Sequence, residues 1–212
     1  FADIESVFEE IKPDIVVIAT PDETHISLLQ DVVRLRPKLI VCEKPVQLSV
    51  EDGERVISIE TEIPVVVNYR RRFDSSVKKL RDSILQGEIG EVLGATGIYS
   101  GGFLHNGSHL IDLGRLLFGE MISCTPGPCI SFERCKKFHI LESNSNKFSI
   151  FELDILTEKG RFRFADEGFI LQKQEIIDDP VFDGYRMLGP IAEEKTQLAY
   201  SMEALVEHCV RI

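Results

Sequence analysis

Short apolar runs alternate with amphipathic segments of helical length in the first seventy residues of the chain. The runs at 15–19, 39–42 and 64–67 are nearly unbroken, which is typical of strands buried on both faces of a parallel sheet. Segments 22–35 and 49–59 between them repeat apolar residues at helical spacing. Because strands joined by helix-length crossovers run parallel, the sequence predicts a βαβαβ unit of a doubly wound α/β fold.

The pattern changes after this unit. A helix is expected over 75–86, and a second one from Glu193 to the C-terminus. Between them, loosely alternating segments predict strands of an open, mostly antiparallel sheet: 92–99, 130–133, 148–156, 161–165 and 169–174. We therefore expect two domains, a partial dinucleotide-binding domain at 1–68 and an α+β domain at 69–212.

Composition excludes several classes of protein. The chain has 24 basic and 35 acidic residues, a net charge of −11, which disfavours nucleic-acid binding. No apolar run reaches the roughly 18 residues that a membrane span needs. The five cysteines are an odd number without zinc-ribbon spacing, so we interpret them as reduced thiols of a cytoplasmic protein. A disulfide between Cys124 and Cys129 is the alternative.

Three local motifs follow the predicted elements in order. Ala19-Thr20-Pro21, with His25 after it, ends the first run, and Glu43-Lys44-Pro45 ends the second. In the second domain, glycine-rich sequence precedes His109, and Asp112 follows three residues later. This ordered set resembles the glucose–fructose oxidoreductase and inositol dehydrogenase family, written Gfo/Idh/MocA.

The resemblance implies a Rossmann domain that binds NAD or NADP, followed by an α/β domain that binds substrate. Its open sheet would also join subunits into a homodimer or homotetramer. The implied reaction moves a hydride to or from a secondary alcohol of a sugar, cyclitol or nucleotide sugar. The implied cofactor-binding residues are Ala19, Thr20, Pro21, His25, Glu43, Lys44 and Pro45. The expected substrate-binding residues are Asn68, Tyr69, Arg70, His105 and Asp112.

Lys44, His109 and His105 are the candidate catalytic residues. Lys44 follows a strand end, where ligands bind in open α/β sheets, and an ammonium there would stabilise alkoxide charge. The alternative is a surface lysine before a turn proline. His109 is a candidate general base in the first turn of a helix, oriented by Asp112; the alternative is a capping or core histidine. His105 stands where the family usually has aspartate, which leaves the substrate class open.

Other residues keep two interpretations each. His105, His109 and Asp112 follow H-x3-H-x2-D, which is also a metal-ligand spacing, although Gly107 argues that His105 precedes the helix. His25 either approaches the cofactor or is an ordinary polar residue on an exposed helix start. Arg70, with the two arginines after it, either steers an anionic substrate or belongs to a solvated segment with one ion pair.

One departure from the family pattern is clear. The fifteen glycines include no G-x-G-x-x-G, the phosphate-binding motif of the first βα turn in a dinucleotide fold. The βαβαβ unit thus corresponds to the second half of a Rossmann fold, and we expect the chain to be an N-terminally truncated fragment. The alternative to a fragment is a protein that has lost its cofactor site. The alternatives to the oxidoreductase activity are a non-catalytic binding or dimerisation module and an NAD-dependent glycosidase of the same family.

Overall fold

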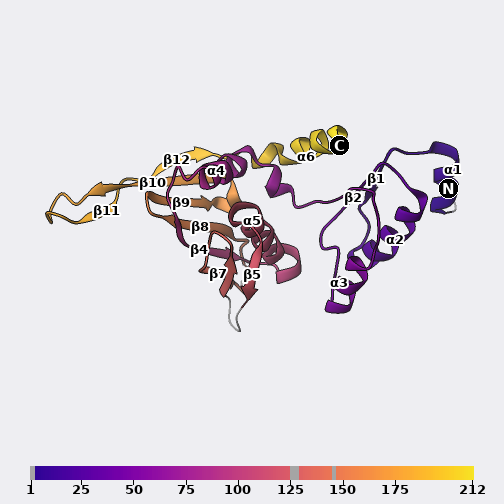
Figure 1. Cartoon of the computed structure of the whole chain (residues 1–212), viewed down its shortest axis with the longest axis horizontal. Helices are drawn as coiled ribbons and strands as arrows, with labels where there is room; N and C mark the ends of the chain where they lie inside the picture. The colour runs from indigo at the N-terminus through magenta and orange to yellow at the C-terminus, as the bar shows by residue number, and fades with distance from the viewer. Residues whose placement is uncertain (1–2, 125–128, 145–146) are drawn as a thin grey trace. The chain divides into compact units, whose positions relative to one another are not determined.

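The computed structural model of the protein describes residues 3–124, 129–144 and 147–212. These residues form two compact units (Figure 1). The first contains the chain up to Tyr69 together with Leu205–Ile212, and the second contains Arg70–Ala204. No helix in the described ranges is long and apolar enough to cross a lipid bilayer. The division of tasks between residues 1–68 and 69–212 stays a prediction.

The first unit is built on a parallel sheet. Its described residues place three strands in the order β1-β2-β3, with β2 at the centre. All four residues of β2 are buried, and Leu29 and Val32 of the helix before it join Ile40 in one core cluster. In chain order the elements are α1 (Ile4–Ile11), β1 (Ile15–Ile18), η1 (Asp22–Thr24), α2 (His25–Leu35), β2 (Leu39–Cys42), α3 (Val50–Ile57) and β3 (Val65–Val67). The predicted βαβαβ unit is confirmed.

The helix boundaries of this unit follow local side-chain chemistry. Asp3 caps α1 by accepting a hydrogen bond from the backbone of Ser6, and Ser49 caps α3 by accepting one from Asp52. Helices α1 and α2 both end at a residue with left-handed backbone, Lys12 (φ 50°) and Arg36 (φ 54°). These ends turn the chain directly into β1 and β2.

The second unit is built on a larger mixed sheet. Its described strands lie in the order β11-β10-β9-β8-β4-β7-β6-β5, and β12 pairs with β10. All these pairs are antiparallel except β4 with β7. The strands are β4 (Val92–Tyr99), β5 (Met121–Cys124), β6 (Cys129–Phe132), β7 (Phe138–Glu142), β8 (Phe151–Thr157), β9 (Gly160–Ala165), β10 (Ile170–Asp178), β11 (Arg186–Leu188) and β12 (Ala192–Lys195). The helices are η2 (Arg70–Phe73), α4 (Ser75–Leu85), the π-helical η3 (Phe103–Gly107), α5 (Ser108–Phe118), η4 (Asp166–Gly168), η5 (Leu198–Tyr200) and α6 (Ser201–Arg211), of which α6 continues into the first unit. The predicted fold class is confirmed.

Helices α4 and α5 form the core of this unit with one face of the sheet. Helix α5 packs close to the sheet because a glycine lies at each of two contact points. A Cβ atom on Gly97 of β4 would lie 2.5 Å from Leu110, and one on Gly114 of α5 would lie 2.5 Å from Phe132. Contacts with Leu110 and Phe132 therefore fix the distance between the sheet and α5, the helix that carries His109.

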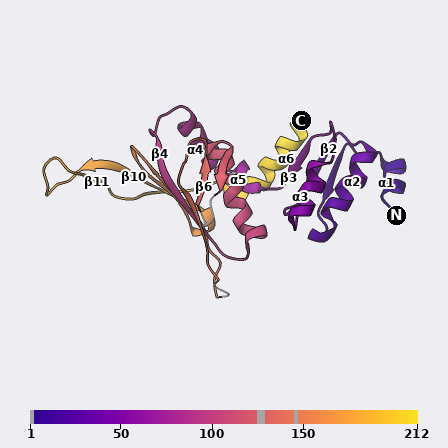
Figure 2. The ribbon, with the colours of Figure 1, turned by 60° about the horizontal axis from the view of Figure 1, so that its bottom comes forward.

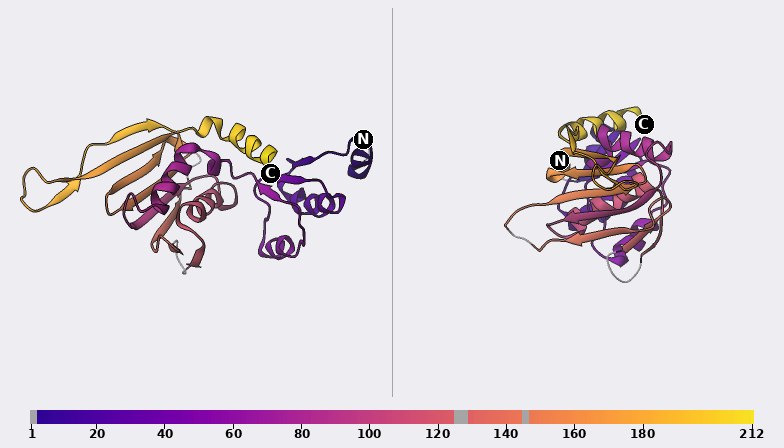
Figure 3. Two further views of the ribbon diagram at one scale, coloured as in Figure 1. Left: turned by 45° about the horizontal axis from the view of Figure 1, so that its top comes forward. Right: turned by 90° about the vertical axis from the view of Figure 1, so that its left-hand side faces the viewer.

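Strand β10 is longer than its neighbours in the sheet. Its first six residues pair with β9, whereas its last three pair with β11. The β10–β11 hairpin consequently extends beyond the rest of the sheet as an arm (Figures 2 and 3). Aromatic residues Phe182 and Tyr185 at its tip are exposed and in edge contact.

The prediction of one helix from Glu193 to the C-terminus is wrong in its first part. Residues 192–195 form β12, and the helix α6 starts at Ser201. Ala-Glu-Glu-Lys favours a helix by intrinsic propensity, but pairing with β10 overrides it. Lys173 and Glu194 form a 2.9 Å ion pair across that strand pair. Strands β5, β7 and β11 were also missing from the sequence prediction.

Candidate functional site

The carboxyl ends of the three parallel strands bring the first two sequence motifs together. The backbone N–H of Glu43, after β2, donates to the carbonyl of Ile18 at the end of β1 (2.9 Å). The N–H of Asn68, after β3, donates to the carbonyl of Cys42 (2.8 Å). Residues 19–21, 43–45 and 68 thus lie on one edge of the sheet, the edge where ligands bind in open α/β folds.

Side chains join these strand ends as well. The Asn68 side-chain amide donates to a carboxylate oxygen of Glu43 at 2.5 Å, and Asn68 is only 8% exposed. Lys44, between Glu43 and Pro45, is half-buried, and its peptide bond to Pro45 is cis. Burial raises the pKa of the neighbouring Cys42 thiol to about 11, and the negative charge of Glu43 adds to that rise. Cys42 is accordingly an uncharged thiol below this edge.

The Ala19-Thr20-Pro21 segment is exposed at the same edge. It turns into α2 through hydroxyl contacts: Thr24 donates to the carbonyl of Pro21 (2.7 Å), and the hydroxyls of Thr20 and Thr24 are 2.6 Å apart. Tyr69, expected to contact substrate, ends the first unit and donates its N–H to Val67 (2.7 Å).

His25 is buried, not exposed. It starts α2 at 0% exposure, so its interpretation as a polar residue on an exposed helix start is wrong. One ring nitrogen lies 2.8 Å from the carbonyl oxygen of Thr20, and the other lies 2.8 Å from that of Pro45. The side chain therefore contacts both turns from beneath.

In the second unit, both candidate catalytic histidines lie where the chain enters α5. His109 is the second residue of α5, which starts at Ser108, and His105 is in the preceding π-helical turn η3. His105 is exposed, whereas His109 is 8% exposed and meets the ring of Phe151 edge-on at 6.2 Å between centroids. The expectation that His109 stands in the first turn of a helix is confirmed.

Asp112 forms an ion pair with Arg72. The Arg72 Nε lies 2.6 and 2.7 Å from the two carboxylate oxygens of Asp112. Burial raises the pKa of the Asp112 carboxyl above its ordinary value, and the charge and hydrogen bonds of Arg72 offset part of that rise. This partner, forty residues away in sequence, was missed in the sequence analysis.

The three consecutive arginines differ in their surroundings. Arg70 is exposed, Arg71 donates to the carbonyl of Glu167 (2.6 Å), and Arg72 binds Asp112. The guanidinium carbon of Arg71 lies 3.7 Å from the ring centroid of Phe151, a cation–π contact. Burial lowers the pKa of Arg71 to about 10. Only Arg70 of the three keeps an exposed charge for an external ligand.

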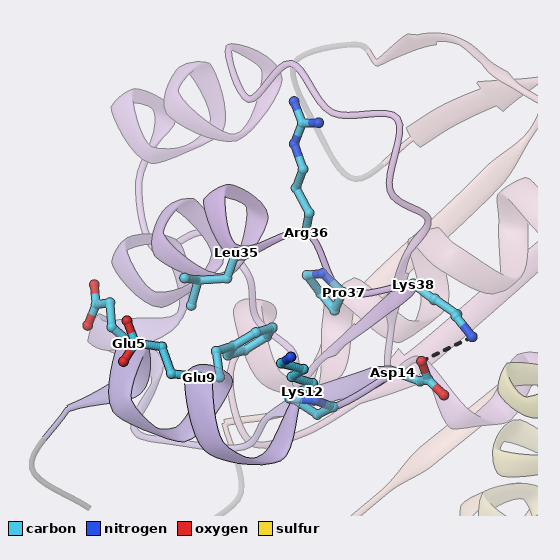
Figure 4. A pocket seen from close by; sticks show the side chains of 10 residues that line it. Glu5, Glu9, Lys12, Asp14, Leu35, Arg36, Pro37 and Lys38 are labelled. Atoms are coloured by element: carbon cyan, nitrogen blue, oxygen red, sulfur yellow. Dashed lines mark ion pairs between the residues drawn. The ribbon is translucent and has the colours of Figure 1, made fainter.

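The described residues contain no group of three or more His, Cys, Asp or Glu side chains placed to hold a metal ion. A cavity of about 450 Å³ opens in the first unit, lined by α1, the end of α2 and the residues before β1 and β2 (Figure 4). It lies at the amino ends of the strands, opposite the ligand edge. Its charges are balanced, and Lys38 is paired with Asp14 at 3.1 Å.

Comparison with known proteins finds similarity that is strongest in the first unit. Residues 1–70 match the family model described as the oxidoreductase family Gfo/Idh/MocA, NAD-binding Rossmann fold. The first unit is therefore similar to the NAD-binding domain of this family. Inositol 2-dehydrogenase of Rhizobium meliloti (strain 1021) is 38% identical over 81 residues, 37% of this chain and 24% of the relative. Myo-inositol 2-dehydrogenase of Thermotoga maritima is 28% identical over 138 residues, 58% of this chain and 41% of the relative.

Several solved structures share the fold of this chain. The structure titled levoglucosan dehydrogenase in complex with NADH and levoglucosan has a TM-score of 0.74 at 17% identity. That match covers 98% of this chain and 72% of the other. An inositol dehydrogenase homolog from Azotobacter vinelandii, complexed with NADH and myo-inositol, has a TM-score of 0.65 at 18% identity, covering 86% and 56%. The chain spans less than half the length of the curated relatives described above.

Proposed function

We propose that the protein is an NAD(P)-dependent oxidoreductase that transfers a hydride to or from a secondary alcohol of a sugar, cyclitol or nucleotide sugar. The observation that carries this proposal is the ligand edge of the first unit. There the Ala19-Thr20-Pro21 and Glu43-Lys44-Pro45 turns meet at the carboxyl ends of parallel strands, within residues matched by an NAD-binding family model.

The residues at this edge fit the nicotinamide end of the cofactor. The exposed residues 19–21 carry no charge, and they share this edge with the half-buried, charged residues Glu43 and Lys44. The sequence has no G-x-G-x-x-G, so these residues do not form a glycine-rich phosphate-binding loop. We assign Ala19, Thr20, Pro21, Glu43, Lys44 and Pro45 to cofactor binding. The chemistry supplied by a bound nicotinamide is hydride transfer.

Lys44 and His109 have different roles in this proposal. The Lys44 ammonium donates a hydrogen bond to the substrate oxygen and stabilises its negative charge as the hydride leaves or arrives. The His109 imidazole takes the hydroxyl proton during oxidation and returns it during reduction. This imidazole stands in the first turn of α5.

The remaining assignments concern the substrate. His105 and Arg70 are exposed polar groups of the second unit, suited to bind hydroxyl or anionic groups of a sugar-like molecule. Asp112, held by Arg72, and Asn68 with Tyr69 complete the proposed substrate set. We assign cofactor binding to residues 1–68 and substrate binding with subunit assembly to residues 69–212. The proposed assembly is a homodimer or homotetramer, formed through the sheet of the second unit.

The test is a titration of the full-length protein with NADH and NADPH, followed by turnover assays on myo-inositol, D-xylose and levoglucosan. Lys44→Ala should lower kcat by about 10²–10³, and His109→Gln by about 10²–10⁴. Lys38→Ala is the matched control, because that side chain is 80% exposed at the opposite edge of the sheet. It should leave both measurements unchanged.

Two outcomes contradict the proposal. Absence of binding to either nucleotide would favour the binding or dimerisation module. Cleavage of a glycoside without net change in NADH would favour the glycosidase.

A further inference from the structure

The hydrogen bonds that His25 can form depend on how many protons its ring carries. Both ring nitrogens lie 2.8 Å from a backbone carbonyl oxygen, Nε2 from Thr20 and Nδ1 from Pro45. Carbonyl oxygens only accept hydrogen bonds. A neutral imidazole has one N–H, so one of the two contacts would set a nitrogen lone pair against an oxygen lone pair. An imidazolium donates to both.

Acidic residues outnumber basic residues on the two turns that His25 contacts. The ionisable groups on the Thr20 turn are Asp22 and Glu23, and those on the Pro45 turn are Glu43 and Lys44. Three carboxylates against one ammonium leave a net negative charge on the two turns. The Cys42 thiol, whose pKa is raised to about 11, contributes no charge at neutral pH. At 0% exposure no water competes for the ring protons.

The two bonds link separate parts of the ligand edge. The Thr20 carbonyl belongs to the exposed segment after β1, and the Pro45 carbonyl directly follows Lys44 after β2. Fixing both carbonyls on one rigid ring fixes the distance between these two turns. We propose that His25 carries a proton on each ring nitrogen and acts as a positioning residue that clamps the Thr20 turn to the Pro45 turn. The functional side of this inference rests on the proposed role of both turns in cofactor binding.

The proton count is measured directly on the unaltered full-length protein. In ¹⁵N NMR spectra at neutral pH, both His25 ring nitrogens should show the signature of a protonated nitrogen. His25→Gln identifies the resonance. One protonated and one unprotonated nitrogen would overturn the proposal, and this measurement requires no cofactor.

The clamp is tested by hydrogen exchange in two variants. In His25→Gln, exchange in peptides covering 19–24 and 43–47 should accelerate relative to β2, because an amide cannot replace both donors. Leu29→Ala is the control, since Leu29 is buried on the same helix and contacts the core but neither carbonyl. The Leu29→Ala substitution should accelerate hydrogen exchange in the two turns and in β2 to the same extent. Equal acceleration in His25→Gln would contradict the clamp.

Cofactor affinity separates this proposal from the proposed function. His25→Gln should weaken NADH binding about tenfold, roughly the worth of one lost hydrogen bond. Leu29→Ala should leave the affinity within about twofold, a change of less than ~0.5 kcal/mol. If the unaltered protein binds no dinucleotide while the NMR and exchange results hold, the clamp stands and the proposed function fails. If it binds NADH and His25→Gln binds it equally well, the positioning role is overturned.

Discussion

The neighbouring arginines Arg70 and Arg71 illustrate how one residue type serves two purposes. Arg70 is exposed, while Arg71 stacks on Phe151 and donates to the carbonyl of Glu167. Arg71→Ala should lower the free energy of unfolding by about 2–4 kcal/mol, because it removes a buried cation–π contact and a charge-assisted hydrogen bond. Arg70→Ala should change it by less than about 0.5 kcal/mol. Urea unfolding of both variants is the measurement, and equal losses would contradict the assignment.

The Asp112 carboxyl predicts a pH dependence. Burial raises its pKa in the folded state above the ordinary 3.8, so the folded protein holds this proton to higher pH than the unfolded chain does. Its contribution to stability is therefore full below pH 3.8 and is lost as pH rises through the raised pKa. Asp112→Asn does not titrate. The stability of the natural protein relative to this variant should fall across that window, by at most about 1.4 kcal/mol per pH unit. Urea unfolding at a series of pH values tests this, and a difference that rises with pH would contradict it.

The residues at the strand ends were predictable, and their tertiary partners were not. Apolar runs mark where strands stop, so Thr20, Glu43 and Asn68 could be placed at one edge from the sequence. The bond of Arg72 to Asp112 joins residues forty positions apart on different elements, and no local pattern encodes it. The burial of His25 was equally hidden, because the three residues before it, 22–24, are polar.

At the scale of elements, the seating of α5 on the sheet depends on Gly114. A Cβ atom there would lie 2.5 Å from Phe132, which is fully buried between Phe118 and Phe138. Gly114→Ala should therefore destabilise by about 1–3 kcal/mol through overpacking. Gly53→Ala is the matched control in α3, where the close neighbour is the flexible side chain of Gln47. It should be neutral or stabilise by up to ~1 kcal/mol through helix propensity. Thermal unfolding of both variants tests this prediction. Equal melting temperatures would contradict the close packing of α5 on the sheet.

Elements with strong periodicity were predicted well, and elements created by edge pairing were not. Strands β1 to β4 formed where apolar runs predicted them, although Val17 of β1 is 62% exposed and that strand is not buried on both faces. By contrast, β12 has four exposed residues and exists because β10 offers it free backbone groups and Lys173 a carboxylate partner. A short polar strand of this kind has no apolar pattern that could distinguish it from a helix.

At the scale of the whole molecule, the two sides of the large sheet differ. One side packs on α4 and α5, and along β8 the side chains pointing the other way are Glu152, Asp154 and Leu156. The two acidic groups pair with Arg163 and Arg161 of β9, and Leu156 is 47% exposed. Two paired charges followed by an exposed leucine form a surface that a second copy can cover without burying an unpaired charge.

We therefore expect the protein to assemble through this side of the sheet, and Leu156→Asp to dissociate it. A buried, unpaired carboxylate at the interface should weaken association by on the order of 10²-fold or more. Folding should be retained because the position is half-exposed in the single chain. Ile57→Asp in α3 is the control, since Ile57 is 86% exposed on the first unit and outside this surface. Light scattering coupled to size exclusion gives the mass. The proposal requires a multiple of the chain mass for the natural protein and Ile57→Asp, and the mass of one chain for Leu156→Asp. A single-chain mass for the natural protein, or an unchanged assembly in Leu156→Asp, would show that this surface does not join subunits.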